Sequence, residues 1–217
     1  MSRKRLKKEF LRVFGMKAPA SGKAKRLFES LAAEYRSAGR AWHTLEHIRQ
    51  ILAFLKKRRV EINDWPSVQL AAWFHDVVYD TKAKDNEEQS ALYARECLKQ
   101  LGIPPEVVKH TTALIRATKK HKAIPHDKDS RIFLDADLSI LGSGKKDYDN
   151  YAAKIRKEYA WAPEELYRTG RKKALTGFLK RKHIYFTAAV RNELEKRARR
   201  NLRREIAQLT AREAVRV

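Results

Sequence analysis

Residues 70–76, Leu-Ala-Ala-Trp-Phe-His-Asp, place an imidazole and a carboxylate at the end of an uninterrupted apolar run. Because polar groups in such surroundings must lose water, His75 and Asp76 need a compensating partner, and a divalent cation would satisfy both. For an isolated pair, a histidine hydrogen-bonded to a neighbouring carboxylate inside a core is the commoner arrangement. Residues elsewhere in the chain therefore decide between a metal site and a structural pair.

Apolar residues recur at spacings of three and four along most of the chain, and no segment alternates convincingly with a period of two. The pattern predicts an all-α fold. The expected helices are residues 24–37, 44–57, 66–79, 87–101, 104–120, 130–141, 148–159, 163–181 and 187–208. Neither a repeat nor a long linker divides them. We therefore predict one helical domain over residues 23–217, preceded by a loosely held basic arm, residues 1–22.

The amino-acid composition indicates which binding partners and which cellular compartment to expect. The 217 residues include 49 basic and 26 acidic side chains, so the formal net charge is +23, which attracts phosphate-bearing partners from nucleotides to nucleic acid. Cys97 is the only cysteine, which excludes an intramolecular disulfide and favours a reducing compartment. No stretch approaches the ~20 apolar residues that a membrane span requires. We therefore expect a cytoplasmic protein.

His43 and His47 lie four residues apart in Trp-His-Thr-Leu-Glu-His, residues 42–47. Where such a segment is helical, this spacing places both rings on one face. The two histidines can bind one metal ion together, or one can bind the ion while the other faces the substrate. The pair is a second candidate element of a metal site.

A third element is Phe-Leu-Asp-Ala-Asp-Leu-Ser-Ile-Leu, residues 133–141. On a helix, Asp137 lies at the centre of an apolar face, whereas Asp135 points the other way. The pattern therefore predicts that Asp137 is the buried carboxylate. Such a group needs a metal ion, an arginine or several hydrogen-bond donors as its partner.

Together these residues resemble the pattern of the HD superfamily of metal-dependent phosphohydrolases: a histidine, a His-Asp pair, and a distant aspartate followed by an apolar residue. The matching positions are His47, His75 with Asp76, and Asp137. The resemblance implies that these four side chains hold a divalent metal ion and that the fold is a single helical bundle of the HD-domain kind. It fixes the class of reaction more than the substrate.

Two segments are also similar to cyclic-nucleotide phosphodiesterases. Residues 42–47 resemble their Tyr-His-Asn-x-x-His run, and residues 136–139, Ala-Asp-Leu-Ser, match their own. In those enzymes the second histidine binds metal and the first acts as a general acid. The likeness implies that His47 is a ligand and that His43 donates a proton to the leaving oxygen.

Residues 75–81, His-Asp-Val-Val-Tyr-Asp-Thr, resemble the His-Asp-x-x-Glu-Asp-Thr segment of alarmone hydrolases. That family has a glutamate, thought to help activate water, where this chain has Tyr79. The resemblance leaves Asp80 as the candidate for that catalytic role.

Four further motifs resemble those of a group of uncharacterised predicted HD hydrolases: His-Thr-Leu-x-His at 43–47, Asn-Glu-x-x-Ser-Ala at 86–91, Asp-Ala-Asp-Leu at 135–138 and Gly-Arg at 170–171. The likeness covers residues 43–202, roughly three-quarters of the chain. A second metal ion or the substrate is a candidate partner for His121 and for Glu87, although an acidic residue also suits the first turn of a helix. Arginine matches phosphate by its geometry, and Arg40 and Arg171 are the candidate phosphate ligands.

These observations predict a metal-dependent phosphohydrolase for a nucleotide or another small phosphorylated metabolite. Mixed histidine and carboxylate ligands suit Mn²⁺, Fe²⁺, Co²⁺, Ni²⁺ or Zn²⁺ without choosing among them. The alternative is a non-catalytic protein that binds nucleic acid through its basic surface. A third possibility is a dioxygenase that uses a di-iron version of the same fold, which needs more ligands. Metal number and oligomeric state stay open.

Overall fold

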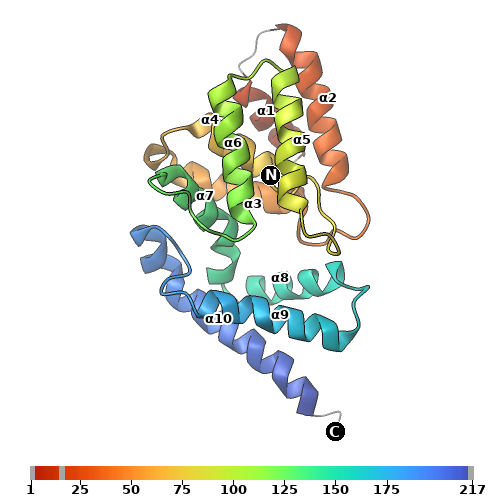
Figure 1. The fold of residues 1–217 in the computed structure, drawn as a ribbon, viewed down its shortest axis with the longest axis vertical. Coiled ribbons are helices and arrows are strands. Elements are labelled where there is room, and N and C mark those ends of the chain that lie inside the picture. Colours follow the sequence, from red (N-terminus) through yellow and green to blue (C-terminus); the bar gives the residue numbers. More distant parts are fainter. Residues whose placement is uncertain (1–2, 15–17, 215–217) are drawn as a thin grey trace. The chain divides into compact units, whose positions relative to one another are not determined.

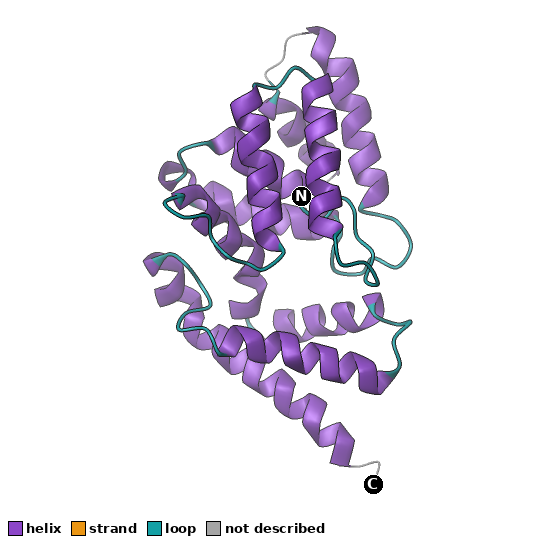
Figure 2. Ribbon diagram, viewed as in Figure 1, coloured by secondary structure: helices purple, strands orange, loops and turns teal. Residues whose placement is uncertain are grey.

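The computed structural model describes residues 3–14 and 18–214, with side chains described for residues 3–14 and 22–211. These residues form ten α-helices and two short 3-10 helices and contain no strand (Figures 1 and 2). The all-α fold predicted from the sequence is therefore confirmed. In this described part of the chain, no helix combines the length and the apolar character needed to cross a lipid bilayer. The chain divides into two compact units, Met1–Ala136 and Asp137–Val217.

The first unit is built around one short, buried helix. The elements of the unit are α1 (Arg3–Val13), α2 (Ala18–Glu34), α3 (Leu45–Lys57), η1 (Arg59–Glu61), α4 (Trp65–Phe74), α5 (Asn86–Gln100), α6 (Pro105–Thr118) and α7 (Lys128–Asp137). Helices α1, α3, α5 and α6 all pack against α4, and every residue of α4 from Ser67 to Phe74 is buried. A helix that is apolar on all sides has to lie inside a core.

Helix α4 ends earlier than the sequence pattern indicates. Its first turn holds Pro66, and the carboxylate of Asp64 accepts a hydrogen bond from the Ser67 N–H at 3.1 Å, as expected of an N-cap. The apolar run predicted a helix to Tyr79, but the helix stops at Phe74. His75 therefore follows the helix directly, at the edge of the core.

The basic arm expected for residues 1–22 differs from the structure. Within the described residues, Arg3–Val13 form α1, whose Leu6 and Phe10 are buried in the core. The Phe10 ring lies 5.2 Å from the Trp73 ring, centroid to centroid. Each such buried side chain contributes about 1.5–3 kcal/mol, which holds a strongly basic helix in place. The domain boundary at residue 22 stays a prediction.

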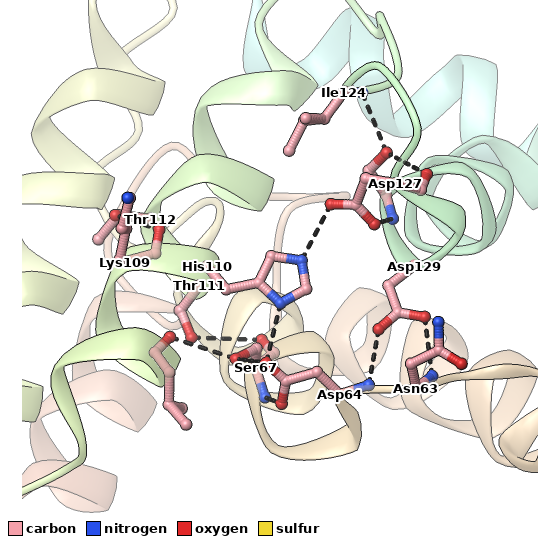
Figure 3. Close-up of polar contacts among 12 residues, drawn as sticks. Asn63, Asp64, Ser67, Lys109, His110, Thr111, Thr112, Ile124, Asp127 and Asp129 are labelled. Carbon is pink, nitrogen blue, oxygen red and sulfur yellow. Dashed lines mark hydrogen bonds and ion pairs between the residues drawn. The ribbon is translucent and has the colours of Figure 1, made fainter.

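A histidine links the beginnings of α4 and α7 (Figure 3). His110, on α6, lies with Nδ1 2.8 Å from Asp64 Oδ2 and with Nε2 3.0 Å from Asp127 Oδ2. Asp127 also accepts a hydrogen bond from the Ser130 N–H at 3.0 Å, in the first turn of α7. We call Asp64, His110 and Asp127 the His110 clasp. Both ring nitrogens must carry hydrogen to donate to two carboxylates, so the clasp requires a protonated imidazole.

The second unit contains η2 (Leu138–Gly142), α8 (Lys145–Glu158), α9 (Glu164–Leu179) and α10 (Ala188–Ala214). Helix α10 packs against η2, α8 and α9. At η2 the approach is close, because a Cβ added to Gly142 would lie 2.6 Å from the Leu194 Cβ. The Asn201 amide and the Arg197 guanidinium of α10 donate hydrogen bonds to carbonyls at the end of η2. Polar contacts and tight packing thus fix η2 to α10.

The second unit also buries an ion pair, which we call the Glu205 cluster (Tyr148, Arg171 and Glu205). The Arg171 guanidinium donates two hydrogen bonds to the Glu205 carboxylate, at 2.8 and 3.2 Å. The Tyr148 hydroxyl donates a third. Burial and the neighbouring Glu205 charge raise the pKa of Tyr148 far above its usual value, so the phenol remains a donor.

Candidate metal centre

Side chains from three separate segments of the chain converge at one place. His47, His75 and Asp137 each offer one ligand atom, and these atoms lie within 4.8 Å of one another. His47 belongs to α3, His75 follows α4 directly, and Asp137 is the last residue of α7. The boundary between the two units falls just before Asp137, so the other nine residues of that helix belong to the first unit. Such a set of nitrogen and oxygen donors can hold a divalent ion.

Asp76 adjoins the same donors. Its Oδ2 lies 2.8 Å from His75 Nε2 and 3.7 Å from His47 Nε2. The two imidazole nitrogens face each other at 3.3 Å. Since two lone pairs repel at that distance, the nitrogens need a shared proton or a shared cation between them. We call the four side chains of His47, His75, Asp76 and Asp137 the metal cluster, meaning the residues that could together hold one metal ion.

The N-cap of α3 helps to fix the position of His47 within the metal cluster. Thr44 is the N-cap residue, and its hydroxyl accepts a hydrogen bond from the Glu46 N–H at 3.3 Å. The buried Ile48 and Ile51 anchor the helix in the core, and His47 itself is only 3% exposed. An imidazole buried to this degree has been stripped of water, so its ring nitrogen needs another partner.

His43 does not share a helix with His47, so the common face that the spacing gives within a helix does not apply. His43 precedes the N-cap of α3 and lies in a turn. Its ring nevertheless lies 5.7 Å from the His47 ring and 4.3 Å from the Tyr79 ring, centroid to centroid. His43 is thus beside the metal cluster and remains partly exposed.

A hydrogen bond to the main chain orients His75. Its Nδ1 lies 3.2 Å from the carbonyl oxygen of Ala72. A carbonyl only accepts, so this geometry places a ring hydrogen on Nδ1, and Nε2, which faces Asp76 and His47, is the nitrogen that would bind a metal ion after giving up its own hydrogen. Metal-binding histidines in proteins are commonly oriented by such a second hydrogen bond.

Positive charge dominates the electrostatics of Asp76. Burial by itself would raise the pKa of this carboxyl, but the nearby imidazoles of His75, His43 and His47 and the hydrogen bond from His75 outweigh it. The pKa of Asp76 consequently lies well below its usual value. The carboxylate stays ionised, which is the form that binds a metal ion.

The burial of the two aspartates in α7 is the reverse of what the sequence predicted. Asp135 is fully buried, whereas Asp137 is partly exposed. The prediction that Asp137 is the buried carboxylate of the pair is therefore wrong. It assumed one continuous helix over residues 130–141, but the chain changes from α to 3-10 geometry after Asp137. A change of helix type alters the angle between successive side chains, so the apolar face drawn for a single α-helix does not apply.

Three other candidates lie in different surroundings. The Asp80 carboxylate is in an exposed turn and accepts a hydrogen bond from the Lys82 N–H at 2.8 Å. Glu87 is in the first turn of α5, where the helix dipole favours an acidic residue. His121 follows α6 in a turn, with a positive φ of 41°. Their suggested roles in water activation, substrate binding or a second metal site stay predictions.

Both candidate phosphate ligands have protein partners. Arg171 donates to Glu205 in the second unit. Arg40 donates to the carbonyl oxygens of Asp76 and Val77 at 2.7 and 2.8 Å. The sequence analysis missed this contact between Arg40 and the main chain of a cluster residue. The available signal was the position of Arg40 three residues before His43, in a turn made possible by Gly39, whose φ is +89°.

Comparisons with protein-family models, with curated proteins and with solved structures found no significant match. The function therefore has to be argued from the geometry of the metal cluster.

Proposed function

We propose that this protein is a cytoplasmic, metal-dependent phosphohydrolase of the HD superfamily. The observation that carries the proposal is the convergence of ligand atoms from His47, His75 and Asp137, with Asp76 beside them. The residues of the metal cluster are those that the HD pattern assigns to metal binding. A pattern read from distant parts of the sequence gains support when its members meet in space.

The protein side chains have separate roles in this proposal. The four residues of the metal cluster would hold one divalent transition ion, such as Mn²⁺, Fe²⁺, Co²⁺, Ni²⁺ or Zn²⁺. A bound ion of this kind supplies positive charge that favours ionisation of water and offsets charge developing on a phosphoryl group. His75 is kept in the ligating tautomer by its hydrogen bond to the Ala72 carbonyl.

His43 is the proposed proton donor to the leaving oxygen. Its ring lies beside His47 and is partly exposed, so a substrate can reach it. Contact with the Tyr79 ring restricts its orientation. General acid catalysis of this kind typically accelerates a reaction by about 10²–10⁴-fold.

The proposed substrates are nucleotides or other small phosphoesters. The net charge of +23 draws phosphate groups to the protein and raises their local concentration. The same charge would attract nucleic acid, so charge alone does not separate the hydrolase from the binding protein. Hydrolysis of a phosphoester that depends on the metal cluster would distinguish the hydrolase from the binding protein.

The test uses the purified protein with matched variants. Elemental analysis measures bound metal, and a panel of phosphomonoesters and phosphodiesters is assayed with added Mn²⁺, Co²⁺ or Ni²⁺. We expect Asp76→Ala to lose metal and turnover, and His43→Asn to keep metal while losing about 10²–10⁴-fold in kcat. Asp85→Ala, which alters an exposed carboxylate hydrogen-bonded to Gln89, should match the wild type.

Salt-sensitive nucleic-acid binding that persists in Asp76→Ala, with no hydrolysis of any phosphoester by the wild type, would favour the binding protein.

A further inference from the structure

The early end of α4 leaves main-chain carbonyl groups that need partners, because the last four carbonyls of a helix have none within it. Contacts after the helix satisfy all four. The Ala71 carbonyl accepts from His75 N at 2.9 Å, Ala72 from His75 Nδ1 at 3.2 Å, Trp73 from the Tyr35 hydroxyl at 2.9 Å, and Phe74 from Val77 N at 3.1 Å. The segment that carries two residues of the metal cluster is thus held by specific hydrogen bonds.

Arg40 satisfies the carbonyls beyond the helix. Its Nη1 donates to the Asp76 carbonyl at 2.7 Å and to the His43 carbonyl at 3.1 Å, and its Nη2 donates to the Val77 carbonyl at 2.8 Å. Asp76 belongs to the metal cluster, and His43 is the proposed proton donor. One guanidinium therefore fixes the main chain of both residues, although they lie far apart in the sequence.

The guanidinium itself is held firmly. Its Nε donates to the Ser37 hydroxyl at 3.1 Å, and its central carbon lies over the rings of Tyr35 and Tyr79, 5.1 and 5.3 Å from their centroids. Tyr79 in turn contacts the His43 ring. Cation–π contacts of this kind stabilise an arginine in one orientation. Arg40 and Tyr79 thus restrain both the main chain and the ring of His43.

These contacts leave Arg40 poorly suited to bind phosphate. A guanidinium has five N–H groups, and the four hydrogen bonds described use four of them. Bidentate recognition of phosphate requires two parallel N–H groups. Arg40 can offer only one without releasing a carbonyl.

We infer that Arg40 is a positioning residue that sets the main chain of Asp76 and His43 for metal binding and proton donation, and is not a ligand of the phosphate. The inference rests on the proposed function. Lysine should not replace arginine here, because its ammonium group is a single point and cannot reach three carbonyls in the plane of a guanidinium.

The experiment compares Arg40→Lys and Arg40→Met with Arg116→Met. The methionine variant keeps an unbranched stem beside the tyrosine rings and removes every donor. Arg116 provides the control, because its guanidinium binds the exposed side chain of Glu88. Co²⁺ and Mn²⁺ are titrated by calorimetry into each protein after chelator treatment, well below its melting temperature in the chelator. We expect both Arg40 variants to bind the ions about 10–100-fold more weakly and Arg116→Met to match the wild type.

Steady-state kinetics with bis(p-nitrophenyl) phosphate and inhibition by inorganic phosphate provide the second readout. A positioning role predicts a lower kcat in the Arg40 variants at saturating metal, with little change in KM or in the inhibition constant for phosphate. If metal affinity stays within twofold of the wild type while KM and the inhibition constant rise, Arg40 is a phosphate ligand and the inference is overturned. Should Arg40→Met fail to fold, Arg40→Lys supports the same comparison.

The outcomes separate this inference from the proposed function. A wild-type protein that binds metal but hydrolyses no phosphoester contradicts the proposed function, and the metal titration still decides the role of Arg40. A wild-type protein that binds neither ion contradicts both.

Discussion

The two units of the chain each bring a carboxylate into contact with cationic or ionisable partners, but by different means. In the Glu205 cluster, a guanidinium and a phenol donate three hydrogen bonds to one carboxylate. In the metal cluster, the Asp76 carboxylate faces the ring nitrogens of His75 and His47. The Arg171 guanidinium is always charged, whereas the imidazoles of His75 and His47 can gain or lose their charge.

This difference separates a structural ion pair from a site that can change its occupant. Arginine keeps its proton at any physiological pH, so Arg171 permanently neutralises Glu205. A neutral imidazole offers a lone pair, so His47 and His75 can exchange a proton for a metal ion. An arginine that keeps its proton can serve as a permanent structural partner. A histidine that can exchange its proton for a metal ion can serve in a metal site.

The largest effect on stability should come from breaking the structural pair. Glu205→Gln would leave the Arg171 guanidinium buried without a carboxylate, which we expect to lower the free energy of unfolding by about 3–5 kcal/mol, measured by urea denaturation. Its affinity for Co²⁺ should remain that of the wild type. The double variant Glu205→Leu with Arg171→Met, in which neither charge is left, should be much less destabilised than Glu205→Gln. If the double variant is less stable than Glu205→Gln, the ion pair itself stabilises the fold, beyond neutralising a buried charge.

The metal cluster should respond to metal itself, with a somewhat smaller effect. Mn²⁺ or Co²⁺ at 100 times its dissociation constant should stabilise the wild type by about 2.7 kcal/mol, and chelator should reverse the change. His75→Ala should abolish this stabilisation, and Glu205→Gln should keep it. Thermal unfolding with and without each ion measures both. Equal stabilisation of His75→Ala and the wild type would place the ion elsewhere.

The His110 clasp should give the smallest of the three effects and an effect that depends on pH. Burial would lower the pKa of His110, but hydrogen bonds and charge from Asp64 and Asp127 raise it above the usual value. A raised pKa in the folded state stabilises the protein fully below the ordinary pKa of histidine, and this contribution is lost as the pH rises through the raised value. We expect His110→Gln to lower the free energy of unfolding by about 1–3 kcal/mol near pH 6.

Urea denaturation over a series of pH values measures this effect, and the difference from the wild type should shrink as the pH rises. His183→Gln, which changes an exposed histidine, serves as the control. The pKa of Asp64 is lowered because hydrogen bonds from Ser67 and His110 outweigh the opposing effect of burial. Its own contribution is therefore lost in acid, as the pH falls through that lowered value. A pH-independent difference for His110→Gln would contradict a protonated clasp.

The sequence predicted the helical class and the members of the metal cluster because both depend on local patterns. Period and spacing are sufficient to predict the helical class but not where each helix ends, and the HD pattern selects His47, His75, Asp76 and Asp137 without knowledge of how the helices pack. Burial was harder to predict, as the reversal of Asp135 and Asp137 demonstrates. It depends on where α geometry gives way to 3-10 geometry, and tertiary contacts decide that point.

Long-range polar contacts were the least predictable feature. Arg40 is one of 49 basic residues, and its position after Gly39 and near His43 indicates a turn but does not reveal the contact with the carbonyls of Asp76 and Val77. The His110 clasp left a partial signal, since Asp64 and Asp127 each precede a serine by three residues at the start of a helix. The N-cap motif marks the two helices. The histidine that joins them comes from a third helix.

The His110 clasp also means that substitutions far from the metal cluster can change its geometry. Helices α4 and α7 each contain ten residues and are therefore about 15 Å long. The clasp ties their first turns, whereas the cluster residues His75 and Asp137 lie at their far ends. A mutational scan that ranks positions by distance from the metal cluster would overlook Asp64, His110 and Asp127. Tilting either helix at its remote end displaces a candidate metal ligand, so directed evolution of this scaffold should sample these three positions early.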